Sequence, residues 1–126
     1  MRIAAAHWHG RISPVFDVAG AIWVADIVRG QVAHRETASL VSRDPFGRAA
    51  EVARLGVQVL LCGALSDVLE RALVATGVRV ISFVCGDLDA VIAAFLRGEL
   101  VEAAFQMPGG YGRGRRHRVR AGRRWQ

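Results

Sequence analysis

Two cysteines are the side chains of this chain best suited to hold an iron–sulfur cluster. Cys62 is followed directly by Gly63, and Cys85 is followed directly by Gly86. Thiolates are the usual ligands of iron–sulfur clusters, and a glycine beside each thiol lets backbone N–H groups approach a cluster or an anion. The alternative is that both thiols are small apolar side chains of the core, a frequent fate of free cysteines.

Two histidines near the N-terminus form a second candidate ligand set. His7 and His9 flank Trp8, so in an extended segment both imidazoles face the same side, and neutral imidazole binds zinc, copper and iron. The alternative is that both form ordinary hydrogen bonds. Further along, Ser13 is placed either to bond an anionic ligand or to form a Ser-Pro turn, and Phe16 is expected to anchor this loop in the core.

The periodicity of apolar residues predicts five strands and three helices around these candidate ligands. Asp44 and Asp87 are expected N-caps, and Arg29-Gly30 is expected to join two strands in a hairpin. The helix near 66–76 is expected to pack through Val68, Leu69, Ala72 and Leu73. The expected strands span 2–6, 21–27, 31–37, 57–62 and 78–84, and the expected helices span 45–55, 66–76 and 88–97.

This order of elements predicts an antiparallel meander followed by two strands that are reached through helices. Right-handed crossovers make the last two strands parallel to the first. The expected fold is therefore α/β and ribonuclease H-like, a mixed five-stranded sheet of order 3-2-1-4-5 with helices packed on it. Because a ligand crevice borders the carboxyl ends of parallel strands, Cys62, Cys85 and the loop after the first strand are expected at one site.

The charge of the chain is concentrated at its C-terminal end. The 126 residues carry a formal net charge of +6, but residues 1–109 contain ten Arg against all 11 acidic residues. Residues 110–126 contain seven Arg and no acidic residue. We therefore predict a domain over 1–109 and an Arg/Gly-rich disordered tail over 110–126, which binds nucleic acid or an acidic protein or has no function of its own.

No apolar run approaches the roughly 18 residues that cross a bilayer, and no basic N-terminal region precedes a long apolar stretch. A soluble, cytoplasmic protein without a membrane partner, monomeric or weakly dimeric, is expected. A nuclease is not expected from this fold class, because residues 1–6 hold no carboxylate for a two-metal site. No pair of nucleophile and general base is evident, so the chain is predicted not to be an enzyme.

Five short motifs occur between residues 1 and 109 in the order R-I-S-P-V-F-D-V-A, D-P-F-x-R-A, L-L-C-G-A-L-S, V-C-G-D and F-Q-M-P-G. Together they resemble the dinitrogenase iron–molybdenum cofactor biosynthesis family. The resemblance implies a small ribonuclease H-like domain that binds or carries an iron–sulfur or iron–molybdenum-type cluster. Proteins that donate or accept such a metallocluster are its implied partners.

Two positions differ from the family pattern. Val15 stands where nitrogen-fixation members often have His, and Gly110 stands where many stand-alone members have Cys. The sequence thus leaves two hypotheses. In the first, His7, His9, Cys62 and Cys85 are the metal ligands of a non-enzymatic carrier, with Ser13, Phe16, Gly63 and Gly86 completing the cofactor site. In the second, the chain is a regulatory or interaction module that has lost the cluster and binds through its Arg-rich tail.

Overall fold

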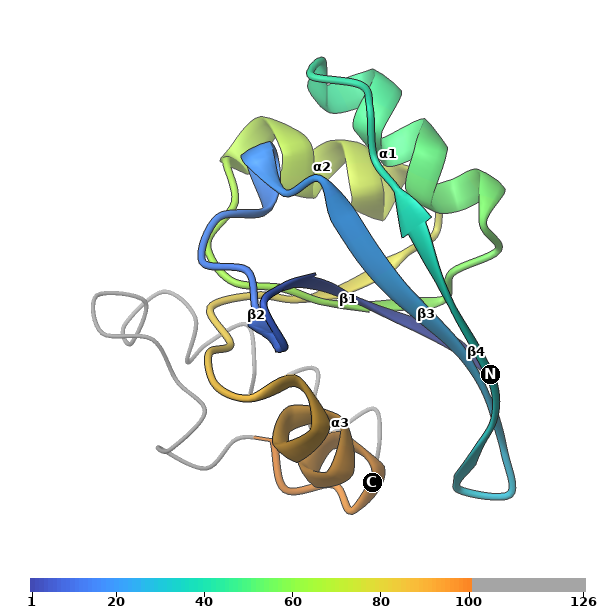
Figure 1. Cartoon of the computed structure of the whole chain (residues 1–126). Coiled ribbons are helices and arrows are strands. Elements are labelled where there is room, and N and C mark those ends of the chain that lie inside the picture. Colours follow the sequence, from blue (N-terminus) through green and yellow to red (C-terminus); the bar gives the residue numbers. More distant parts are fainter. Residues whose placement is uncertain (101–126) are drawn as a thin grey trace.

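The computed structural model describes residues 1–100, which form an α/β fold with one mixed sheet and three α-helices (Figure 1). The predictions for residues 101–109 and for the tail lie outside the described residues. The strands are β1 (Arg2–Trp8), β2 (Arg11–Ile12), β3 (Ala21–Val28), β4 (Gln31–Ser39), β5 (Val59–Leu61) and β6 (Arg79–Ile81). The helices are α1 (Pro45–Arg54), α2 (Asp67–Ala75) and α3 (Leu88–Leu96), and a 3-10 turn, η1, spans Phe16–Val18.

The sheet contains six strands where the sequence predicts five. Its order is β4-β3-β1-β5-β6, and β2 lies off this path, paired with the end of β1. This differs from the predicted 3-2-1-4-5 because the additional strand β2 enters the numbering and pairs with β1. As expected, β3 pairs antiparallel with both β1 and β4, whereas β5 lies parallel to both β1 and β6. Two residues are too few to show an alternating pattern, so β2 leaves no sequence signal.

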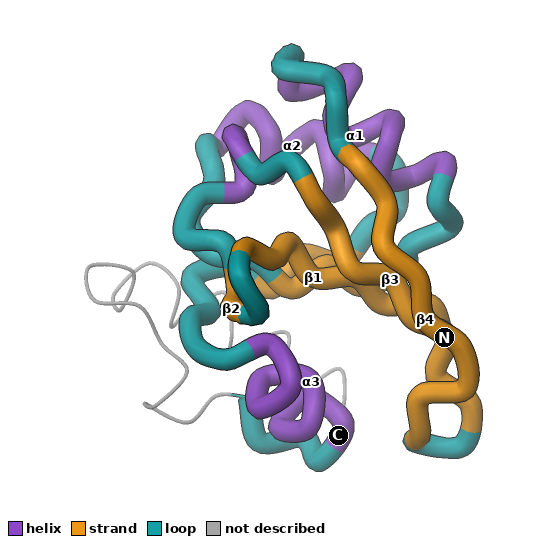
Figure 2. Tube along the Cα trace, in the orientation of Figure 1, coloured by secondary structure: helices purple, strands orange, loops and turns teal. Residues whose placement is uncertain are grey.

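The sheet separates two apolar layers. Helices α1 and α2 lie on one face and α3 lies on the other (Figures 1 and 2). Alternate residues of β1 pack into the two apolar layers. Ala4 and Ala6 belong to the cluster beneath α1 and α2, and Ile3 and Ala5 belong to the cluster beneath α3. This follows from the period of two in a strand, which places successive side chains on opposite faces.

Local signals account for the ends of the helices. Asp44 accepts a hydrogen bond from the Gly47 N–H (2.8 Å), and Asp87 accepts one from the Ala90 N–H (3.4 Å), as the capping predictions require. One prediction about α2 is wrong, because the Val68 side chain is 48% exposed and does not pack against the sheet. No helix among residues 1–100 is long and apolar enough to cross a membrane.

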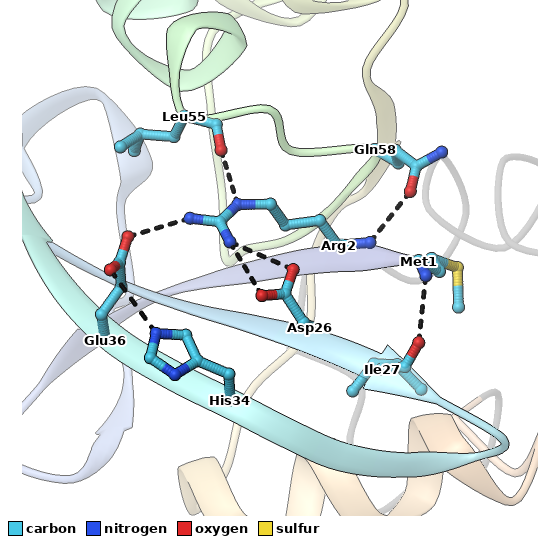
Figure 3. Close-up of polar contacts among 8 residues, drawn as sticks. All are labelled: Met1, Arg2, Asp26, Ile27, His34, Glu36, Leu55 and Gln58. Carbon is cyan, nitrogen blue, oxygen red and sulfur yellow. Dashed lines mark hydrogen bonds and ion pairs between the residues drawn. The ribbon is translucent and has the colours of Figure 1, made fainter.

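Arg2 joins four separate segments at the amino end of β1 (Figure 3). Its guanidinium donates to Asp26 on β3 (3.1 and 3.2 Å) and to Glu36 on β4 (2.9 Å). The Nε–H donates to the Leu55 carbonyl at the end of α1 (2.6 Å), and the backbone N–H donates to the Gln58 side chain (2.9 Å). The planar fork of Arg suits such divergent acceptors better than a lysine ammonium does.

Replacing Arg2 with Met keeps the aliphatic stem and removes the fork. We expect Arg2→Met to lower the free energy of unfolding by about 1–2 kcal/mol, because a half-buried carbonyl and two carboxylates lose a charged donor. Urea denaturation measures the change. The control is Arg35→Met on exposed β4, since Arg35 has no ion pair among residues 1–100. Equal losses in the two variants would contradict this role of Arg2.

Glu51 of α1 holds the connection between β4 and α1. Its carboxylate accepts hydrogen bonds from the backbone N–H groups of Val41 (3.1 Å) and Ser42 (3.0 Å). Desolvation by itself raises the pKa of Glu51, but these two hydrogen bonds and the charges of Arg48 and Arg54 outweigh it, so the pKa lies below its ordinary value.

The lowered pKa makes the contribution of Glu51 to stability depend on pH. A carboxyl group with a depressed pKa in the folded state stabilises the protein above its unfolded-state pKa, and this stabilisation is lost as the pH falls through the folded-state value. We expect Glu51→Gln to be less stable than the parent near neutral pH and equally stable in acid. Thermal unfolding from about pH 7 to about pH 3 tests this expectation. Stability curves that run parallel over the whole range would exclude it.

Candidate functional site

The chain between β1 and β3, residues 9–20 and here called the first loop, lies across the carboxyl ends of the parallel strands. Backbone hydrogen bonds fasten it to the loop after β5. The Ala64 N–H donates to the Pro14 carbonyl (2.8 Å), and the Phe16 N–H donates to the Ala64 carbonyl (2.8 Å). Phe16 is fully buried beside this contact, which confirms that it anchors the first loop in the core.

A second set of backbone bonds fastens the first loop to the loop after β6. The Ile12 N–H donates to the Gly86 carbonyl (2.9 Å), and the Leu88 N–H donates to the Gly10 carbonyl (2.9 Å). The first loop therefore bridges the ends of β5 and β6, which the sequence predicts as the border of the ligand site. Gly86 has a backbone φ of +123°, which residues other than glycine rarely adopt. This backbone conformation is a structural reason for glycine beside Cys85.

Gly63 lies directly beneath the first loop. A Cβ atom at this position would stand 2.6 Å from the Ser13 carbonyl oxygen and closer still to the carbonyl of Pro14. The Gly63 carbonyl also accepts from the Phe83 N–H (3.0 Å), so the residue sits between the first loop and the loop after β6. Close packing of three backbone segments thus accounts for glycine here.

A hollow of about 360 Å³ opens between the end of β1 and the first loop. The Nε2 atom of His7 is buried and has no hydrogen-bond partner among the described residues. A buried polar atom without a partner is uncommon, because its desolvation is then uncompensated. The residues lining the hollow are His7, Trp8, Ser13, Pro14, Val15, Val18, Ala19 and Gly20.

The imidazole of His9 does not face the same side as that of His7, as a shared metal site would require. The sequence-based expectation places both imidazoles on one side of an extended segment, but β1 ends at Trp8 and His9 lies in the turn to β2 with a φ of +52°. Its ring packs edge-on against the Trp8 ring, with centroids 4.3 Å apart, and both side chains are exposed. The tight turn to β2 therefore overturns that expected geometry.

The two cysteines lie in adjoining loops but in different surroundings. Cys62 is fully buried in the apolar cluster beneath α1 and α2, whereas Cys85 is partly exposed. The loops adjoin because the Val84 N–H donates to the Cys62 carbonyl (3.0 Å). Within residues 1–100, no group of three or more His, Cys, Asp or Glu side chains converges as for a metal ion. Ligation by these thiols stays a prediction.

Arg48 supports the wall of the hollow, and it was not identified from the sequence as a residue of the site. Its side chain, only 3% exposed, lies over the Phe16 ring with 5.8 Å between guanidinium carbon and ring centroid. It donates to the carbonyl of Ala19, a residue of the hollow (2.6 Å), while its Nε has no partner among the described residues. The D-P-F-x-R-A motif contains this arginine, but only the fold shows that it supports the wall of the hollow.

Several solved structures share this fold. The protein PH0822 has a TM-score of 0.73 at 23% identity over 79% of this chain and 94% of its own. The apo form of the orange protein from Desulfovibrio gigas has a TM-score of 0.66 at 24% identity, covering 85% and 96%. A "putative dinitrogenase" from Methanocaldococcus jannaschii has a TM-score of 0.64 at 19% identity, covering 83% and 96%. At these identities the likeness shows the fold alone.

No protein-family model and no curated protein sequence matches the chain. The name of the M. jannaschii protein nevertheless fits the cofactor-biosynthesis family that the five motifs resemble.

Adding a methyl group at Gly63 tests the packing of the first loop. We expect Gly63→Ala to lower the free energy of unfolding by about 1–3 kcal/mol, because the added Cβ forces the backbone of the first loop at Ser13 and Pro14 to move. The matched control is Gly20→Ala, where an added Cβ meets no atom within 4 Å and the backbone is not left-handed. Chemical denaturation of both variants gives the comparison, and a Gly63→Ala variant as stable as Gly20→Ala would refute the close packing.

Proposed function

We propose that this protein is a non-enzymatic binding or carrier protein for an iron–sulfur-based metallocluster of the iron–molybdenum cofactor-precursor type. In this proposal it is a ribonuclease H-like cytoplasmic member of the cofactor-biosynthesis family. The observation that carries the proposal is that His7 lines the hollow and has a buried Nε2 without a hydrogen-bond partner among residues 1–100. The name of the M. jannaschii protein, a "putative dinitrogenase", and that of the orange protein, which was solved as an apo form, support the same class of function.

His7 fits a metallic or anionic cargo chemically. A neutral imidazole nitrogen ligates iron, and an imidazole N–H donates a hydrogen bond to sulfide or to another anion. Either contact would compensate this nitrogen, which has no partner within residues 1–100. Because the nitrogen is buried, the imidazole ring must turn toward the hollow to make the contact. The hollow has the size of an ordinary small-molecule site, and the small residues Ser13, Ala19 and Gly20 along its wall leave room for a cargo.

The other three proposed ligands differ in how easily a cargo in the hollow can reach them. Cys85 is partly exposed at the neighbouring loop, so its thiol is available to a cargo. Cys62 is fully buried in the core, and the first loop must move before a cluster reaches it. His9 stands in an exposed turn, where it ligates only from outside the hollow. We therefore rank His7 first, Cys85 second, and His9 and Cys62 after them.

A carrier must bind its cargo reversibly, and the first loop suits this task. It closes one side of the hollow and is held by backbone bonds to the loops after β5 and β6. Arg48 adds a buried positive charge beneath the same wall, which favours an anionic cargo over a neutral one. The metallocluster is thus treated as cargo passed between donor and acceptor proteins, with the chain supplying shape, one imidazole and positive charge.

Anaerobic reconstitution of the full chain with iron and sulfide tests the proposal. We expect bound iron with visible charge-transfer absorbance, weakened at least about tenfold in His7→Gln. Cys85→Ser should weaken binding less, and Cys62→Ser least, in keeping with their burial. His34→Gln, on exposed β4 away from the hollow, is the matched control.

Three results would count against the proposal. Uptake of iron by His7→Gln equal to that of the control would remove the hollow as the site. Loss of binding in Cys62→Ser alone would move the site into the core. If the protein takes up no cluster at all, the carrier proposal fails. The second hypothesis, an interaction module that binds through its Arg-rich tail, would then be favoured, although that tail lies outside the described residues.

A further inference from the structure

A second concave surface lies between α1 and α2 and shares no lining residue with the hollow. This surface, here called the α1–α2 groove, encloses about 430 Å³. Its apolar rim is open to solvent, since Phe46 is 66% exposed and Val68 is 48% exposed. The groove is lined by Phe46, Ala49, Val68, Arg71, Ala72, Ala75 and Thr76.

The spacing of the lining residues matches one face of a helix. On α2 they begin at Val68 and recur at intervals of three and four residues as far as Ala75 and Thr76, a stripe that spans about two turns, or about 10 Å. Three alanines line the groove (Ala49, Ala72 and Ala75), and small residues let the axis of an added helix approach closely. The shape therefore suits an α-helix that lies along α2 with its apolar side down.

Arg71 is the single charged residue that lines the groove. It forms no ion pair or hydrogen bond with any residue between 1 and 100, although Asp67 and Glu70 belong to the same helix. An exposed cation without a partner beside an apolar rim is complemented by a carboxylate on the occupant.

We propose that the α1–α2 groove binds an amphipathic helix of a partner protein, with apolar side chains on the alanine-lined stripe and an acidic residue paired with Arg71. Binding of an amphipathic helix in an apolar groove is a recurrent mode of recognition. This docking surface is separate from the proposed cargo site, so neither proposal depends on the other.

Two other occupants fit the groove less well. In a symmetric dimer over this surface, the one charged lining residue of each copy is Arg71, so like charges approach one another. The chain's own C-terminal segment leaves the described region at Leu100, which packs in the cluster beneath α3 on the opposite face of the sheet. The acidic Glu102 follows too soon to cross the sheet, and residues 110–126 carry seven Arg and no acid.

The test titrates the full chain with three synthetic helical peptides that share a Leu/Ala face and differ only at the position facing Arg71. That position carries Glu, Gln or Lys. Nuclear magnetic resonance locates the binding surface through shifted amide signals, and fluorescence anisotropy gives the dissociation constants. We expect shifts confined to α1 and α2, and a Glu peptide that binds about fivefold more tightly than the Gln peptide.

Variants of the protein separate the groove from its surroundings. Arg71→Glu should reverse the preference, so that the Lys peptide binds best. Ala75→Gln places a long polar side chain in the groove and should weaken binding about tenfold, because the apolar stripe is interrupted. Val74→Gln is the matched control, since Val74 is an exposed neighbour on α2 that does not line the groove. Circular dichroism shows whether each variant is folded.

Specific outcomes would overturn the proposal. These are the absence of binding by every peptide up to about 1 mM, an unchanged preference in Arg71→Glu, or equal effects of Ala75→Gln and Val74→Gln. Sedimentation equilibrium tests whether a second copy of this chain, and not a partner helix, occupies the groove. Self-association of the parent chain that Ala75→Gln abolishes would show that a second copy occupies the groove.

Discussion

The candidate site depends on the backbone hydrogen bonds that fasten the first loop across the ends of β5 and β6. Ala64 and Gly86 each supply one end of this attachment, and Gly63 leaves no space for a side chain beneath it. The attachment adds to two other backbone bonds in fixing the residues from Ser13 to Gly20 relative to His7. These are the Ser13 N–H bond to the Ala6 carbonyl (2.9 Å) and the Leu40 N–H bond to the Gly20 carbonyl (3.0 Å). The wall of the hollow is therefore built from main-chain contacts, which hold its shape and leave its few polar side chains available for a ligand.

Arginine supplies the structural cations of the described region, and two of them stabilise opposite ends of the sheet. Arg2 joins β1, β3, β4 and the end of α1 through carboxylates and a carbonyl. Arg48 is buried between Phe16 and the Ala19 carbonyl and has no carboxylate within ion-pair distance in the described region. Its charge is balanced in part by Glu51 on the same helix, whose pKa it helps to lower, and by its hydrogen bond to the Ala19 carbonyl.

The two concave surfaces have different chemistry, and this supports different roles. The hollow is lined by the imidazole of His7, the hydroxyl of Ser13 and small or apolar residues, which suits a compact cargo with few polar contacts. The α1–α2 groove is open, largely apolar and rimmed by exposed Phe46 and Val68, which suits a protein segment. A carrier needs both kinds of surface, because it must hold its cargo and also meet the proteins that deliver or receive it.

The sequence by itself determined the elements whose signals are local. Caps at Asp44 and Asp87 and the Arg29-Gly30 hairpin follow from residue types within a few positions of each other. The directions of the five longer strands follow from the order of the elements and the right-handed crossover rule. The sequence also picked out His7, Ser13 and Phe16, three residues that the structure does bring to the first loop and its hollow.

Tertiary structure alone decided the features that depend on distant contacts. The strand β2 is held by β1 and by Gly86, Val68 is exposed on α2, and His9 itself adopts a left-handed conformation in the turn after β1. The burial of Cys62 and of Arg48 was decided in the same way. Hydrophobic periodicity states which side of an element is apolar, but which residues meet across space depends on packing between segments that are far apart in the chain.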